Sequence, residues 1–573
     1  MRNMKKPIAA LVTVFVVLCF FSACWSPWQG DAGDGTLTLN FGGTTGLSRV
    51  AVDPPAELAG MVFTVTLSGP GPTLTQTVSG SGTVSFLVNP GIWTVDVRAM
   101  GAPPFNYIDS ITPPDPKAFP DRILRAIGSA TVTVQPGANA AQIPLHTATE
   151  VHNDRQLTTA VDHARDDGKP EYILVAGDIA VNSLSVPPGT NIILASASGV
   201  KKITWPTTGV SPDPLISIPP NVSSPQLPSA TLTLGDPDHP ENTLVIDGSY
   251  AGTTDVLVAV ADATLIMNGS TTITNGNSNG GVMIQGFSGN AVFTMNGGTI
   301  SNNQTAGSGG GVFVEGSSGG SATFIMNGGT ISDNQVTGTG NGGGGVAISG
   351  NGANAAFIMN GGTISDNQAT GSGNGGGVHI GGNGAAFTMN GGTISGNKAD
   401  GDGGGGLYIG EGTVIMSGGV IERNNSINSA LAYGGGIYMD DGSFTMSGSA
   451  LIRNNSATGS AANSQAEGGG VYLANGGAPS FTMNGGTITL NHAQSDSKSL
   501  GGGICNESTV SMILSSGNIS DNTAEITGTT GMASGGGIWS TGTPSPPGVI
   551  VTGNHNLGNG ALVNINNEPE YNW

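Results

Sequence analysis

The chain has 573 residues, enough for two or three domains, and its composition is unusual, with 97 glycines and only 10% charged residues. The glycines follow no Gly-X-Y period, which excludes collagen, and the 37% of hydrophobic residues recur at regular positions, which argues against disorder. The formal net charge of −21 disfavours nucleic acid or an anionic bilayer surface as a partner.

Residues 1–23 have the pattern of a secretory signal peptide. Basic residues near the N-terminus precede an apolar run, residues 8–21, that is short for a membrane span. The sequence Phe-Ser-Ala-Cys at 21–24 resembles the lipobox of bacterial lipoproteins, in a relaxed form, with phenylalanine where leucine is usual, similar to that of spirochaete lipoproteins. The resemblance implies that Cys24 carries lipid and becomes the N-terminus. Ordinary signal cleavage before Cys24 is the alternative.

Processing at Cys24 would remove Cys19 and leave Cys505 as the other cysteine, so no disulfide framework is expected. Residues 24–35 are interpreted as a tether between the lipid and the folded protein. The expected location is therefore the bacterial outer membrane or cell surface, where the N-terminal lipid holds the protein.

Residues 36–148 show short runs of alternating apolar and polar residues, separated by turns rich in Gly, Pro and Ser. In residues 62–67, for example, one face carries Phe63, Val65 and Leu67. The pattern predicts a compact antiparallel β-sandwich of the prealbumin-like or Ig-like kind. The run 91–97 resembles prealbumin-like and carboxypeptidase-regulatory-like modules, and a spacer is the role that we favour for this domain.

Residues 150–262 begin with one helical period, in which Leu157, Ala160, Val161 and Ala164 share a face. This helix is expected to begin after Asn153 or Asp154 and to stop at Gly168. The rest of the segment reads as irregular opening coils of a β-helix. A helix at that point would cover the first coil, which otherwise exposes core side chains and unpaired backbone.

Residues 263–565 repeat a unit that reads Phe-Thr-Met-Asn-Gly-Gly-Thr-Ile-Ser-x-Asn, then a Gly/Ser/Thr-rich stretch, then Gly-Gly-Gly-Val. A methionine recurs every 27 to 37 residues. A unit of that length holds three short strands and three turns, so each unit predicts one coil of a solenoid with coils about 4.8 Å apart. The methionines are Met267, Met295, Met326, Met359, Met389, Met416, Met446, Met483 and Met512.

Equivalent residues of successive units form columns. A phenylalanine two residues before most of these methionines, and a Val, Leu or Ile after each triple glycine, are expected to stack inward. An asparagine follows three residues after each isoleucine, or after Leu451 in one coil, and stacked amides can bond from coil to coil. The predicted structural ladder consists of Asn303, Asn334, Asn367, Asn397, Asn424, Asn454, Asn491 and Asn522.

The Gly-Gly-Gly-Val/Ile and Gly-Thr-Ile-Ser-x-Asn units resemble those of polymorphic outer-membrane and right-handed parallel β-helix repeat proteins, which have the pectate-lyase-like fold. The resemblance covers residues 263 to about 556. It implies an all-β chain with a right-handed parallel β-helix, and a surface-exposed, often adhesin-like protein. Polysaccharide lyases and polygalacturonases share the fold, so catalysis has to be judged from residues.

Two charged pairs are candidates for chemistry. Asp333 and Asp366 precede neighbouring ladder asparagines and would lie about 5 Å apart, a spacing compatible with a carboxylate pair or a cation site. The plainer interpretation is that both make good turns. Arg423 and Arg453 would stack in a similar way without a nearby acidic cluster, which favours a solvated edge. No catalytic residue, metal site or cofactor is therefore assigned.

The residue after each Val, Leu or Ile of the glycine-rich turns is expected to point outward. This column contains several aromatic residues, and its candidate ligand-binding members are Tyr408, Tyr438, Tyr472 and Trp539. Such a row could stack on sugar rings or on a protein partner. Ring stacking that only stabilises the sheet, or cover by a long loop, is the alternative. His379 belongs to the same column and lacks a second ligand at metal-binding spacing.

The sequence thus favours a non-catalytic surface lipoprotein that acts in adhesion, display, or binding of a glycan or of a protein on a host or neighbouring cell. A polysaccharide-degrading lyase or glycosidase on the same β-helix is the alternative function. A purely structural stalk is a third possibility.

Overall fold

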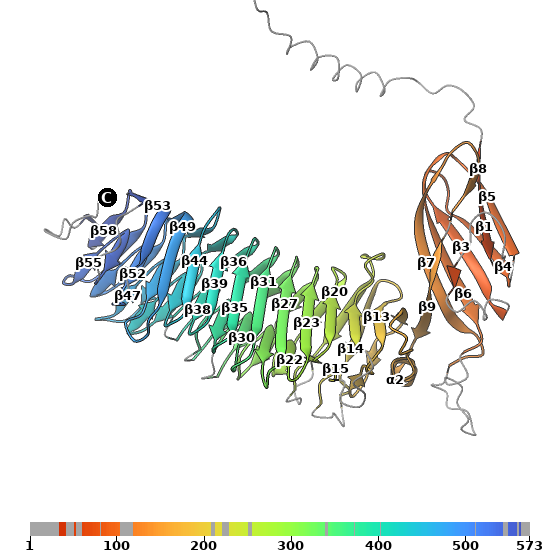
Figure 1. Ribbon diagram of the computed structural model, residues 1–573, viewed down its shortest axis with the longest axis horizontal. Helices are drawn as coiled ribbons and strands as arrows, with labels where there is room; N and C mark the ends of the chain where they lie inside the picture. Colours follow the sequence, from red (N-terminus) through yellow and green to blue (C-terminus); the bar gives the residue numbers. More distant parts are fainter. Residues whose placement is uncertain are drawn as a thin grey trace, which may run out of the picture. The chain divides into compact units, whose positions relative to one another are not determined.

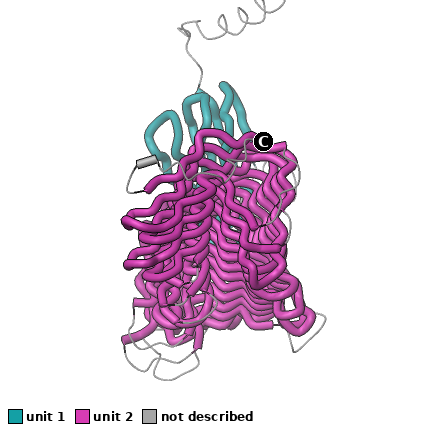
Figure 2. Tube along the Cα trace, turned by 90° about the vertical axis from the view of Figure 1, so that its left-hand side faces the viewer, with its two compact units in different colours: residues 1–102, 124–147 teal, residues 103–123, 148–573 magenta. Residues whose placement is uncertain are grey.

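The structure is a computed structural model that describes residues 34–41, 51–52, 60–80, 82–103, 119–141, 143–207, 213–220, 229–249, 255–338, 342–371, 373–401, 403–509, 512–541, 548–558 and 561–562. The predicted signal peptide, the tether up to residue 33 and Cys24 lie outside the described residues. The chain divides into two compact units, 1–102 with 124–147 and 103–123 with 148–573 (Figure 2).

Unit 1 is built from short strands. Strand β3 (Val62–Ser68) pairs antiparallel with β4 (Leu74–Ser79) and with β6 (Gly91–Gly101). Strand β1 (Gly35–Phe41) lies between β5 (Gly82–Val88), which is antiparallel to it, and β8 (Gly137–Ala140), which is parallel. In β3 and β6 the alternation of apolar residues places one face of the strand inside the unit. The largest buried side chains of its core are Trp93, Phe63 and Phe86.

Helix α2 (Asp154–Asp162) belongs to unit 2 and lies where the sequence predicted a helix. Its N-cap is Asn153, whose side-chain oxygen accepts a hydrogen bond from the backbone N–H of Gln156 at 3.0 Å. The helix ends at Asp162, six residues before the predicted stop at Gly168. Its buried side chains include Leu157 and Val161, which belong to the same apolar core as the coils that follow.

Unit 2 is a β-solenoid of about 11 parallel turns with almost no helix. One coil contains β23 (Asn290–Met295), β24 (Thr299–Ser301), β25 (Gln304–Thr305) and β26 (Val312–Gly316). Each strand pairs in parallel with its equivalent in the next coil, which is β27 (Ser321–Met326), β28 (Thr330–Ser332), β29 (Gln335–Val336) or β30 (Val346–Ser349). Figure 1 shows these strands as parallel rows along the unit.

This coil therefore contains four short strands, whereas the sequence predicted three in each coil. The first two belong to one sheet and run together as the single strand β49 (Ser480–Thr489) in a later coil. We call the sheet of β23, β24 and their equivalents the long sheet. The sheet of β25 and its equivalents is the corner sheet, and the 12-stranded sheet that includes β26 is the third sheet.

The pairing register aligns equivalent residues along the solenoid. Phe293 faces Phe324 and Met295 faces Met326, and both columns continue into the following coils. Neighbouring phenylalanine rings stack at 4.7–4.8 Å between Phe293, Phe324, Phe357 and Phe387. Burial of each such side chain contributes about 1.5–3 kcal/mol. One apolar core runs through the described part of the unit, from Val151 to Val549.

The later coils carry an additional sheet that the sequence pattern did not predict. Its four parallel strands are β42 (Leu431–Tyr433), β47 (Gln465–Glu467), β51 (Lys498–Leu500) and β55 (Met532–Ser534). They occupy the Gly/Ser/Thr-rich stretch between the corner sheet and the third sheet. We call this element the covering sheet, because Tyr433 and Leu500 pack on outward residues of the third sheet.

No helix within the described ranges is long and apolar enough to cross a membrane.

Candidate functional site

A buried row of asparagines follows the turn between the long sheet and the corner sheet. In a typical member, the Asn397 amide nitrogen donates to Asn424 Oδ1 at 2.9 Å and to the Ile364 carbonyl at 3.0 Å. Asn397 Oδ1 accepts from the backbone N–H and the side-chain amide of Asn367, each at 3.0 Å. The observed ladder consists of Asn303, Asn334, Asn367, Asn397, Asn424, Asn455, Asn491, Asn522 and Asn554.

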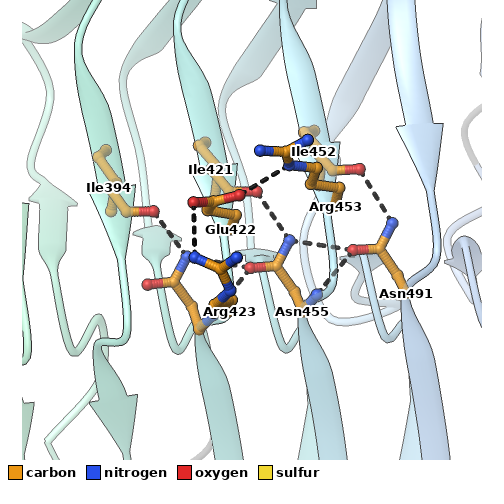
Figure 3. A network of polar contacts seen from close by, with 9 residues as sticks. Ile394, Ile421, Glu422, Arg423, Ile452, Arg453, Asn455 and Asn491 are labelled. Carbon is orange, nitrogen blue, oxygen red and sulfur yellow. Dashed lines mark hydrogen bonds and ion pairs between the residues drawn. The ribbon is translucent and has the colours of Figure 1, made fainter.

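Asn455, and not the predicted Asn454, occupies the ladder in one coil. The pairing register aligns Ile452 with Ile421, so Leu451 is not the equivalent of the other isoleucines. Counting three residues from Leu451 gave a position that was one residue too early. The Asn455 side-chain amide donates a hydrogen bond to Asn491 Oδ1 of the next coil at 3.0 Å (Figure 3).

The residue before each ladder asparagine has a left-handed backbone. Its φ is 57° at Asp333 and Asp366 and 54° at Asn454. These residues therefore make the turn, and the structure gives Asp333 and Asp366 the same backbone role as their uncharged equivalents Asn302 and Leu490. In the part of the chain that the structure describes, no group of three or more His, Cys, Asp or Glu side chains is placed to hold a metal ion.

Arg453 has an acidic partner that the sequence columns did not reveal. Its Nε lies 2.7 Å from Glu422 Oε2, and Arg423 lies 3.1 Å from Glu422 Oε1 (Figure 3). Arg453 aligns with Glu422 and not with Arg423 in the parallel pairing, which is the same one-residue correction as at Asn455. The three side chains form a small group with one net positive charge on the outer surface of the long sheet.

The predicted aromatic row lies on the third sheet, but it is not an open surface. The rings of His379 and Tyr408 stack at 4.9 Å, and those of Tyr408 and Tyr438 stack at 5.0 Å. Tyr472 is only 4% exposed because Tyr433 of the covering sheet stacks on it at 4.6 Å. The expectation that all four candidate residues face solvent is therefore wrong for Tyr472.

The remaining candidates are half-buried. Tyr408, Tyr438 and Trp539 have intermediate exposure, and the intervening Cys505 is completely buried. Tyr438 and Trp539 pack on the cluster of Tyr472, Cys505 and the covering sheet. One alternative that the sequence left open was that a long segment covers the row. In the C-terminal half of the row, the covering sheet does so.

A group of titratable side chains lies between the covering sheet and the third sheet. Lys498 Nζ is 2.6 Å from Glu467 Oε1 and 3.6 Å from Glu507 Oε1. The Tyr472 hydroxyl donates to Glu507 Oε2 at 3.0 Å, and Cys505 Sγ lies 3.9 Å from Glu467 Oε2. We call these five residues the acidic cluster. Sequence reasoning missed it because Glu467 and Lys498 lie in the unpredicted covering sheet.

Burial governs the protonation of this cluster. The Glu467 side chain is 1% exposed, and burial, with the nearby Glu507 carboxylate, raises its pKa to about 7 although Lys498 acts in the opposite direction. Burial and the two carboxylates also raise the pKa of the Cys505 thiol and of the Tyr472 hydroxyl. The thiol and the phenol are therefore neutral in the folded protein at ordinary pH, whereas Glu467 changes its protonation near pH 7.

No protein-family model, curated protein or solved structure matches this chain. The repeat pattern and the geometry described above are therefore the basis for the functional proposals.

Proposed function

We propose that this protein is a bacterial surface lipoprotein whose solenoid displays rows of identical side chains for adhesion, that is, for binding a glycan or a protein on another cell. The observation that carries the proposal is the register of the parallel coils. Because equivalent residues pair from coil to coil, as in the column of Phe293, Phe324 and Phe357, each outward position is also repeated at the coil spacing of about 4.8 Å. A surface of this kind suits a long or repetitive ligand.

The finer architecture belongs to the same proposal. We take the solenoid to be right-handed and pectate-lyase-like, as in polymorphic outer-membrane proteins, and unit 1 to be a β-sandwich that holds the solenoid away from the membrane. The lipobox-like sequence before Cys24 supports lipid anchoring. The net charge of −21 supports a soluble surface that faces the medium.

The test is a binding array of glycans and matrix proteins, probed with residues 25–573, which are the predicted mature chain without Cys24. We expect saturable binding to one ligand class. An array on which the folded protein binds no glycan and no protein would contradict the proposal.

A polysaccharide-degrading enzyme is the second candidate, and the acidic cluster is the observation that favours it. A carboxyl group with a pKa of about 7 can donate a proton at neutral pH, as a general acid does. Its low exposure and the ion pair with Lys498 favour a structural role instead. A reducing-sugar assay on pectins and other polyuronates decides between them: activity that is lost in Glu467→Gln would establish the enzyme.

A further inference from the structure

The outer surface of the long sheet carries rows of hydroxyl and methyl groups in strict register. One row consists of threonines at the start of β24 and its equivalents, namely Thr299, Thr330, Thr363 and Thr393. Two residues further along each strand is a serine, such as Ser332, Ser365 or Ser395. Alternate residues of a strand point to the same face, so the threonine and serine rows run side by side, about 6.5–7 Å apart.

A second row on the same surface is an exposed asparagine ladder, separate from the buried one. Asn327 donates to Asn296 Oδ1 at 3.0 Å, Asn360 to Asn327 Oδ1 at 2.9 Å, and Asn390 to Asn360 Oδ1 at 3.0 Å. Each amide has two N–H groups and two acceptor positions, and the ladder uses one of each. The ladder therefore holds the amides in one orientation and leaves the other donor and acceptor of each for a ligand.

An apolar row completes the pattern. The long-sheet column that contains Thr294 carries Ile or Thr in each coil as far as Ile513, and Ile415 and Ile513 are 44% and 47% exposed. The row consists of Thr294, Ile325, Ile358, Thr388, Ile415, Thr445, Thr482 and Ile513. We call the surface formed by the threonine, serine, exposed asparagine and Ile/Thr rows the threonine face.

The threonine face has almost no charge, although the chain has a net charge of −21. In the long-sheet strands between β19 (Thr264–Met267) and β53 (Ile513–Ser520), the charged residues are Glu422 and Arg453, which pair with each other at 2.7 Å. Arg453 and the neighbouring Arg423 are cationic, and both lie against Glu422. The long-sheet strands from β23 to β36 (Thr393–Ser395) contain no charged residue that could balance the charge of a uronate, a sulfated glycan or a nucleic acid. The face complements a neutral ligand.

We infer that the threonine face binds a neutral, extended polysaccharide, which rests on the proposed role in adhesion and names its ligand class. Sugar hydroxyls can exchange hydrogen bonds with the Thr, Ser and Asn rows, and the apolar faces of sugar rings can lie on the Ile and Thr methyl groups. The sheet is preorganised, so little conformational freedom is lost on binding. Individually weak contacts that recur along a polymer add up to avidity.

The test is a sedimentation assay of the mature chain with insoluble cellulose and chitin, with soluble polygalacturonate as the charged comparison. We expect the protein to sediment with a neutral polymer. The double variant Thr330→Lys/Thr363→Lys places two charges in the middle of the threonine face and should weaken binding at least about tenfold, a loss of about 1.4 kcal/mol. The control is Gln335→Lys/Gln368→Lys, which adds the same charges to the corner sheet of the same coils and should bind like the wild type.

A second variant guards against misfolding of the lysine variant. Thr330→Val/Thr363→Val/Thr393→Val removes three hydroxyls, keeps the β-branched shape, and should also weaken binding with an unchanged melting curve. Undiminished sedimentation of either threonine variant would overturn the inference. Binding to polygalacturonate alone would overturn it too, as would enrichment of the protein in growing ice without binding to a polysaccharide. Wild-type protein that binds array ligands but not cellulose or chitin refutes this inference alone, whereas no binding on the whole array refutes the proposed function as well.

Discussion

Individual asparagines connect successive coils at the turn between the long sheet and the corner sheet. Each ladder amide satisfies an isoleucine carbonyl of the preceding coil and presents its oxygen to the neighbouring asparagine. Only a side chain with both donors and acceptors can do this, so every described coil from Asn303 to Asn554 uses asparagine there. The preceding residue needs only a left-handed backbone, and Asp366, Gly396, Arg423 and Leu490 all supply it.

The first prediction is that Asn397→Ala lowers the free energy of unfolding much more than Asn390→Ala. Loss of the buried amide leaves the Asn367 N–H groups and the Ile364 carbonyl without their bonds, at about 1–3 kcal/mol for each group that stays dry. Asn390 belongs to the same coil but to the exposed ladder, where water replaces the lost bonds, so its effect should stay within about 0.5 kcal/mol. Denaturant unfolding of both variants measures the difference, and equal losses would contradict it.

The second prediction concerns the protonation of Glu467. Its pKa is about 7 in the folded protein and 4.5 in the unfolded chain, so the folded state holds the proton over a wider pH range. The stability that comes from protonated Glu467 is therefore fully present below pH 4.5 and is lost as the pH rises to about 7. Glu467→Gln cannot ionise, so its melting temperature relative to wild type should rise between pH 4.5 and 7 and level off above. Parallel pH profiles of the two proteins would contradict this assignment.

At the scale of elements, periodicity predicted the strands that alternate between core and surface, and it could not predict the covering sheet. The Phe and Met columns of the long sheet repeat over many coils, so the inward face of these strands can be predicted from the sequence. The covering strands have three residues each, and their inward residues are small, as at Ala432, Ala466 and Ala533, so they show no apolar period. The burial of Tyr472 and the position of Glu467 depend on this sheet. Because the sheet was not predicted, the aromatic row was expected to face solvent.

The third prediction follows from that cover. Tyr472→Ser should lower the free energy of unfolding by about 3–5 kcal/mol, the range for removing a buried aromatic side chain. The substitution removes the ring that stacks on Tyr433 and the hydroxyl that donates to Glu507, and it leaves a cavity beneath the covering sheet. Tyr408→Ser is the matched control in the same column, half-buried and outside the covering sheet, and should lose less. Similar losses for both variants would mean that the covering sheet contributes nothing to the burial of this row.

At the scale of the whole molecule, unit 2 is stabilised by contacts between neighbouring coils, as in other repeat architectures. Its core is continuous from Leu157 of helix α2 to Val549, so the helix covers apolar side chains at the start of the unit. The sequence predicted this order of elements because the change from a helical period to strand periods is abrupt near residue 168. The predicted register was wrong where apolar residues adjoin, as at Leu451 and Ile452, and at Met512, because Leu514 is the residue that aligns with Met483.

The fourth prediction concerns how the molecule is held at the cell surface. Cys24→Ala should release the protein from the membrane fraction, because the lipobox-like sequence at 21–24 predicts lipidation of this cysteine. Each buried lipid CH₂ contributes about 0.8 kcal/mol, so two or more acyl chains anchor a protein stably, whereas the protein without lipid has a strongly negative surface that a bilayer repels.

Detergent phase partitioning of cell extracts measures the release. Wild type should enter the detergent phase and Cys24→Ala the aqueous phase. Cys19→Ala is the matched control, because it removes a nearby cysteine from the segment that processing discards and leaves residues 21–24 intact. It should partition like the wild type. Wild-type protein that partitions into water, as the Cys24 variant does, would show cleavage by an ordinary signal peptidase, and the solenoid would then reach its ligand as a free secreted protein.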